Sequence, residues 1–64
     1  MSIQVSTMNV MLLINDNQAT LAAKLLNKNE TVAEASAMTA RVLEMCSVEQ
    51  ATELRTALAQ ELKG

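Results

Sequence analysis

MNVMLLINDN, residues 8–17, is the stretch that decides the fold, because five consecutive apolar residues run directly into a cluster that favours turns and helix caps. The apolar run, Val10 to Ile14, presents hydrophobic side chains on every side of whatever element it forms. A chain of 64 residues hides only about 60% of the surface that its unfolded form exposes. One small subunit is not expected to cover such a run alone, so the sequence predicts that a second subunit covers it.

The composition favours helices. Half of the residues are hydrophobic, none is aromatic, proline is absent, and the only glycine is the terminal Gly64. Alanine, leucine, methionine, glutamate, glutamine, lysine and arginine have the highest helix propensities. The chain is therefore predicted to be all-α, as a single small domain over residues 1–64.

The clearest helix is predicted over residues 48–63. Ser47 and Gln50 have the spacing of a capping box, in which each side chain accepts or donates at the other residue's backbone. Apolar residues then recur at three- and four-residue steps: Val48, Ala51, Leu54, Leu58 and Leu62. A preceding helix is predicted over residues 30–46, capped by Asn29 and rich in small residues at its centre.

The N-terminal third allows two interpretations. In the first, residues 7–27 form a helix that is capped by Ser6 or Thr7 and is kinked or broken at 15–17. With the helices over 30–46 and 48–63, this gives about three helices in an oligomeric helical assembly. Alternatively, Ile3, Val5 and residues 10–14 form a strand that pairs between subunits and is followed by three helices, with Asn15 opening the first. Either way, the N-terminal segment 1–14 is predicted to contribute to self-association.

The sequence has few of the residue types that support catalysis. Histidine and tyrosine are absent, and Cys46 is the only cysteine, so it has neither an imidazole to activate it nor a disulfide partner within the chain. A tetrahedral zinc site cannot be assembled from one thiol. The paired carboxylates Glu30/Glu34 and Glu49/Glu53 suit helix N-termini. The sequence predicts no enzyme, no cofactor, no metal and no small-molecule substrate.

The charge pattern bears on partners and location. A net charge of −2 argues against a nucleic-acid surface, which normally needs a basic stripe. The first basic residue is Lys24, and the apolar run is far shorter than the roughly 20 residues that span a bilayer. A cytoplasmic protein with no membrane contact is predicted. Two short helices meeting near residue 47, with Arg41 and Arg55, leave a helix-turn-helix DNA-binding regulator as an alternative.

The function predicted from these features is that of a small non-enzymatic protein-binding regulator, of the inhibitor, antirepressor, adaptor or chaperone type. It acts as a homo-oligomer, a dimer or higher, through apolar helical surfaces and binds another protein. A purely structural self-assembling subunit is a further alternative. The residues predicted for self-association are Met8, Val10, Met11, Leu12, Leu13 and Ile14. Those predicted for partner binding are Met38, Arg41, Met45 and Arg55, because methionine suits surfaces that accept varied partners.

Overall fold

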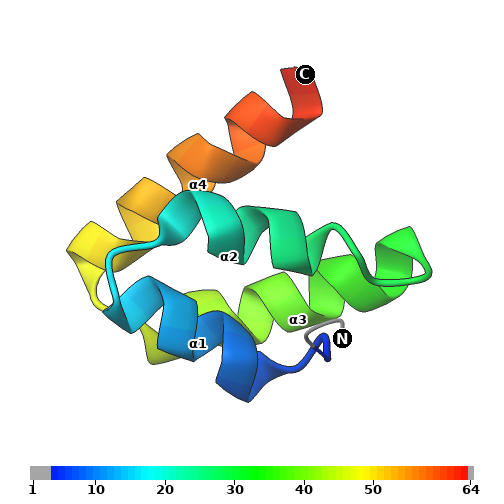
Figure 1. Cartoon of the computed structure of the whole chain (residues 1–64), viewed down its shortest axis with the longest axis horizontal. Helices are drawn as coiled ribbons and strands as arrows, with labels where there is room; N and C mark the ends of the chain where they lie inside the picture. The colour runs from blue at the N-terminus through cyan, green and yellow to red at the C-terminus, as the bar shows by residue number, and fades with distance from the viewer. Residues whose placement is uncertain (1–3, 64) are drawn as a thin grey trace.

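The computed structural model describes residues 4–63, and within that range the chain forms four helices. In chain order they are α1 (Thr7–Asn15), α2 (Ala19–Leu26), α3 (Val32–Met45) and α4 (Val48–Lys63). Figure 1 shows α1 and α2 connected by a tight turn, α3 running behind them, and the C-terminal half of α4 extending away from the other helices. The all-α prediction is confirmed, although the described chain has four helices and not about three.

The extra helix arises from a complete break after Asn15. The amide of Gln18 donates to the carbonyl of Leu13 at 2.8 Å, and the amide of Asn17 donates to that of Ile14 at 3.1 Å. Asn17 adopts a left-handed backbone conformation with φ of 59°. This pair of bonds around a left-handed residue is the Schellman motif, and asparagine is the residue after glycine that tolerates it best. Residues 15–17 were predicted as a kink or a break, and the structure has the break.

The alternative strand prediction is wrong for the described residues. Val10 to Ile14 lie inside α1, which begins at the Ser6 cap, where the hydroxyl accepts the Asn9 amide at 3.2 Å. Val5 precedes the helix without forming a strand, and Ile3 lies outside the described residues. The N-cap at Ser6 decides between helix and strand. Its hydroxyl satisfies the Asn9 backbone amide, which in a strand would need a hydrogen-bond partner from another subunit.

The third helix begins two residues later than predicted. Thr31 is its N-cap, with the hydroxyl accepting the Glu34 amide at 3.1 Å. Asn29, the predicted cap, instead donates its side-chain amide to the carbonyl of Leu26 at 2.9 Å. Asn29 therefore satisfies the C-terminal end of α2, where carbonyls lack helical partners, and the start of α3 is left to the next capping residue. The helix also ends at Met45, one residue before the predicted end.

The capping box at the start of α4 is confirmed. The backbone amide of Gln50 donates to the Ser47 hydroxyl at 3.1 Å, and Oε1 of the Gln50 side chain accepts the Ser47 backbone amide at 2.9 Å. The same glutamine donates its Nε2 to Oδ1 of Asn15 at 3.0 Å. One side chain thus caps α4 and joins its N-terminal end to the C-terminal end of α1.

Replacing Gln50 should lower the stability of the whole fold. Gln50→Ala removes one half of the capping box and the bond to Asn15, and we expect a loss of about 1–2 kcal/mol. For a domain of this size that loss lowers the melting temperature by about 4–8 °C per kcal/mol, measured by circular dichroism. Gln60→Ala, an exposed glutamine on the same helix, is the matched control and should melt like the parent. Equal melting of both variants would contradict the capping role.

The core lies where α2 packs against α1 and α4. The most deeply buried large side chains are Val10, Leu26, Val42 and Leu54, one from each helix. The contacts of α2 with α4 and with α1 are the most extensive, whereas α3 packs mainly on α1. Because α3 and α4 make few contacts beyond the corner that joins them, the two helices diverge and leave a space between them.

Candidate interaction surfaces

The predicted self-association residues divide between the core and the surface. Val10 is fully buried and Ile14 is 4% exposed, both within a single copy of the chain. Met11 and Leu13 are partly buried against the same core. The expectation that one subunit cannot cover the apolar run is therefore corrected for Val10 and Ile14: breaking the helix at Asn15 folds α2 back and lets it cover them. Self-association itself stays a prediction.

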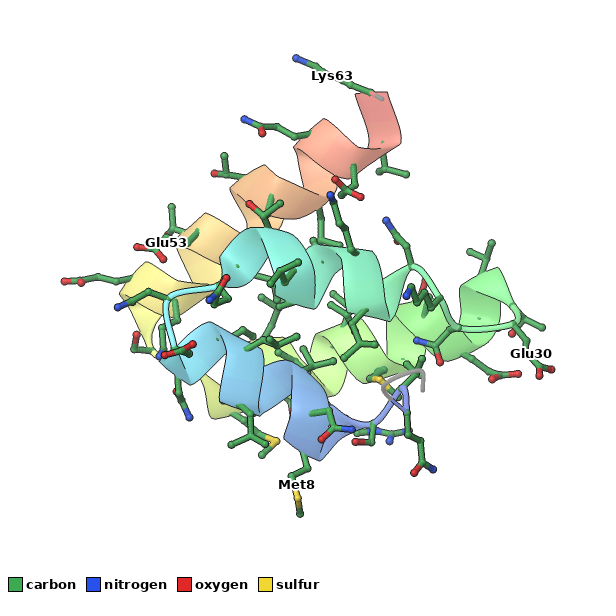
Figure 2. All side chains as sticks on the ribbon, viewed as in Figure 1. Met8, Glu30, Glu53 and Lys63 are labelled. Atoms are coloured by element: carbon green, nitrogen blue, oxygen red, sulfur yellow. The ribbon has the colours of Figure 1, made fainter. Side chains whose placement is uncertain are left out.

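Met8 and Leu12 form an exposed pair, which we call the α1 surface. They are 73% and 61% exposed and lie one turn apart on the side of α1 opposite the core. In Figure 2, Met8 points away from the rest of the molecule, on the side opposite Lys63. None of the nine residues of α1 carries a charge, so this surface has no charged side chain from its own helix.

The predicted partner-binding residues do not form one surface. Met38 is partly buried against the core, and its sulfur accepts the Asn29 side-chain amide at 3.8 Å. Arg41 and Met45 are exposed one turn apart on α3. Met45 is the last residue of α3 and lies near the turn into α4, where Gln50 is hydrogen-bonded to Asn15 of α1. Arg55 is exposed on the other helix, α4.

A groove runs between the diverging α3 and α4, and we call it the α3–α4 groove. It has a volume of about 580 Å³. Its lining residues are Val32, Ala35, Ser36, Thr39, Ala40 and Leu43 on α3, Leu58 and Leu62 on α4, and Asn27, Asn29, Glu30 and Thr31 from the connection between α2 and α3. In Figure 2, Glu30 lies at the far end of the molecule from Glu53. The groove is mostly apolar, and Glu30 is the one charged residue among those that line it.

The two arginines lie on different sides of this groove. On α3, Arg41 is two residues from both Thr39 and Leu43, which places it on the opposite side of the helix from the groove lining. On α4, Arg55 is three residues before Leu58 and therefore flanks the groove. A single copy does not bring the two arginines to a common surface for DNA.

Leu62 belongs to the apolar stripe predicted for residues 48–63, and Val32 is the first residue of α3. They are 84% and 83% exposed and lie on opposite sides of the groove. Helical periodicity identifies which residues share a face but not which neighbouring element covers that face. The small residues at the centre of α3 would allow another helix to approach closely, and the structure leaves that face open.

Other functional groups are sparse in the described chain. The Cys46 thiol is partly buried and donates to the Leu43 carbonyl at 3.7 Å. Residues 4–63 bring no three cysteine, aspartate or glutamate side chains together as a group that would hold a metal ion. None of the helices in this range combines the length and apolar character needed to cross a membrane.

Comparison of the chain with protein-family models, with curated proteins and with solved structures found no match.

Proposed function

We propose that the protein is a small non-enzymatic regulator that acts as a homo-oligomer and holds another protein against the α1 surface. The observation that carries this proposal is the exposure of Met8 and Leu12 on an uncharged helix whose other side is occupied by the core. The central parts of protein–protein interfaces are depleted in charged residues and enriched in methionine.

The chemistry of the pair indicates the kind of partner. Methionine is unbranched and polarisable, so it adapts to the shape of an apolar partner surface. Asn9 and Asn15 are polar residues of the same helix, and each makes a side-chain hydrogen bond within the chain, Asn9 to the Gln4 carbonyl at 2.7 Å and Asn15 with Gln50 at 3.0 Å. An apolar centre with polar groups around it matches the general anatomy of a protein interface. Inhibitor, antirepressor, adaptor and chaperone roles all require such a surface and no reactive group.

Cross-linking at the α1 surface tests this proposal. A photoreactive residue placed at position 8 should cross-link one stoichiometric protein partner in an extract of the native host, and the same residue placed at Glu53 should not. The variant Met8→Ser/Leu12→Ser should lose capture of that partner while keeping its helical circular dichroism, because both side chains lie outside the core. Leu21→Ser, which alters a half-exposed leucine on α2, is the control and should retain capture.

Two outcomes would contradict the proposal. One is capture that the double serine variant leaves unchanged. The other is a salt-sensitive DNA mobility shift that is lost in Arg41→Ala or Arg55→Ala, which would favour the alternative of a DNA-binding regulator.

A further inference from the structure

The corner between α3 and α4 consists of only two residues, Cys46 and Ser47. The Cys46 amide still donates to the Val42 carbonyl at 3.1 Å, as it would inside a helix. On the other side of the corner, the Ser47 carbonyl already accepts the Ala51 amide at 2.8 Å. Between these two bonds the backbone of Cys46 is extended, with φ of −97° and ψ of 168°. A change of backbone conformation confined to the corner is therefore enough to join α3 and α4 into one helix.

The sequence allows a helix to continue through the corner. Proline is absent, and the only glycine is Gly64. At the corner, the last four carbonyls of α3 (residues 43–46) and the first four amides of α4 (residues 47–50) have no partners within their own helices. In a continuous helix, each of these amides donates to the carbonyl four residues before it. The straight form therefore gains four backbone hydrogen bonds per chain, in exchange for the three that the side chains of Ser47 and Gln50 make at the corner.

The core contacts of α4 are made with α2 and not with α3, the helix to which α4 is joined. Ala51, Leu54 and Ala57 are the buried residues of α4. The contacts between α2 and α4 are the most extensive between any two of the four helices, whereas α3 and α4 make few. Straightening the corner therefore detaches α4 from α2 and leaves the packing of α3 on α1 in place.

A straight helix cannot return α4 to the α2 of its own chain. A helix over residues 32–63 is about 48 Å long, whereas the longest dimension of the folded chain is 27 Å. The buried face of α4 then needs another α2, and a second copy of the chain supplies an identical one. We infer that two copies exchange α4, so that α4 of each copy packs on α2 of the other. Such an exchange is a low-cost route to a dimer, because the monomer already contains the interface, and short connections favour it.

Two exposed apolar side chains flank the corner. Met45 is the last residue of α3 and Val48 is the first residue of α4, and they are 62% and 84% exposed. Because they are three residues apart, they come to the same side of a continuous helix. In the exchanged dimer, both straightened segments connect the same two lobes, so they cross near the twofold axis. The exchange therefore places these apolar residues of both copies close to that axis.

This inference rests on the homo-oligomeric part of the proposed function and specifies the contact through which two copies associate. Met8 and Leu12 lie on the side of α1 opposite the core, so the exchange leaves the α1 surface free for another protein.

Two valines supply a matched test of the straight helix. Val32 and Val48 are the first residues of α3 and α4 and are 83% and 84% exposed. Proline is tolerated at the first position of a helix and not in its interior. After refolding from urea at millimolar concentration, sedimentation equilibrium of the full chain should show twice the monomer mass. Val48→Pro should weaken the dimer 100-fold or more, because it places a proline inside each straight helix. Val32→Pro starts a helix in both forms and should leave the dimer unchanged.

Removing the cap of α4 should have the opposite effect. The Ser47 hydroxyl caps α4 only while the corner is bent, so Ser47→Ala destabilises the bent form alone. Two caps are removed per dimer, and we expect dimerisation to strengthen about tenfold or more. Thr31→Ala is the matched control, since Thr31 caps α3 in both forms. It should lower the melting temperature without changing the dimerisation constant.

Cross-linking identifies the copy on which α4 packs. Thr20 of α2 and Thr56 of α4 line one polar hollow between these helices, and both are exposed. In a Cys46→Ser background, Thr20→Cys and Thr56→Cys chains are mixed in urea, refolded together and treated with a short bismaleimide. The exchanged dimer should give a cross-link between one chain of each kind, and Val48→Pro in both chains should abolish it.

Three results would overturn the inference. The first is that the parent chain and Ser47→Ala are both monomeric at millimolar concentration. The second is that Val32→Pro and Val48→Pro affect the dimer equally. The third is a dimer that lacks the cross-link between positions 20 and 56. A dimer that persists in Val48→Pro would reject the exchange but keep the homo-oligomeric proposal. These readouts need no partner protein, so they succeed or fail independently of the capture experiment.

Discussion

Ile14→Asp should abolish folding, whereas Leu12→Asp, two residues away on the same helix, should leave the fold intact. Ile14 is 4% exposed and packs in the core, so a carboxylate there would be buried without a partner, at a cost of several kcal/mol. The total stability of a 64-residue domain is about 3–10 kcal/mol at typical values per residue. The substitution therefore removes most or all of it.

Leu12 gives the control because the same charge replaces a side chain that is 61% exposed. Substitutions on the surface usually change stability by less than about 0.5 kcal/mol, with a further few tenths here from the lower helix propensity of aspartate. Far-UV circular dichroism with thermal melting at low micromolar concentration distinguishes the two variants. A cooperative melt for Ile14→Asp, or a loss of helix in Leu12→Asp, would show that the wrong side of α1 has been assigned to the core.

The difference between Leu12 and Ile14 marks the limit of what the sequence predicted about α1. Its start was predicted because Ser6 is a local signal, read within three residues. The face of α1 that is buried was not predicted, because a run of five apolar residues gives the same pattern on every side of the helix. Only the packing of α2 and α3 against α1 distinguishes its buried residues from its exposed ones, and the packing of α2 depends on the turn at Asn17.

The other helix ends follow the same rule. The start of α4 was predicted because Ser47 and Gln50 satisfy each other locally. The start of α3 was misplaced because Asn29 and Thr31 are both capping residues, and the choice between them depends on the Leu26 carbonyl, which Asn29 reaches only after α2 has ended. Similarly, the α3–α4 groove follows from the divergence of two helices, which is not encoded in the periodicity of either one.

The second large effect is expected for Leu26→Ala. Leu26 is fully buried in α2, the helix that packs on both α1 and α4. Truncation of a buried leucine to alanine costs about 2–5 kcal/mol, from lost transfer free energy and from the cavity left behind. Since α2 has only eight residues and its N-cap Gln18 makes no side-chain capping bond, its stability comes mainly from packing. We expect a loss near 3 kcal/mol by urea denaturation.

Leu21→Ala is the control for this prediction, since it makes the same change on the same helix at a side chain that is 46% exposed. Its loss should be under about 1 kcal/mol, because nearly half of its surface is already exposed to solvent in the folded chain. Both variants should keep the urea m-value of the parent, since m reports the surface exposed on unfolding. If Leu21→Ala were as destabilising as Leu26→Ala, α2 would have to be rotated about its axis. That rotation would turn Leu25 and Leu26 out of the core to which all four helices contribute.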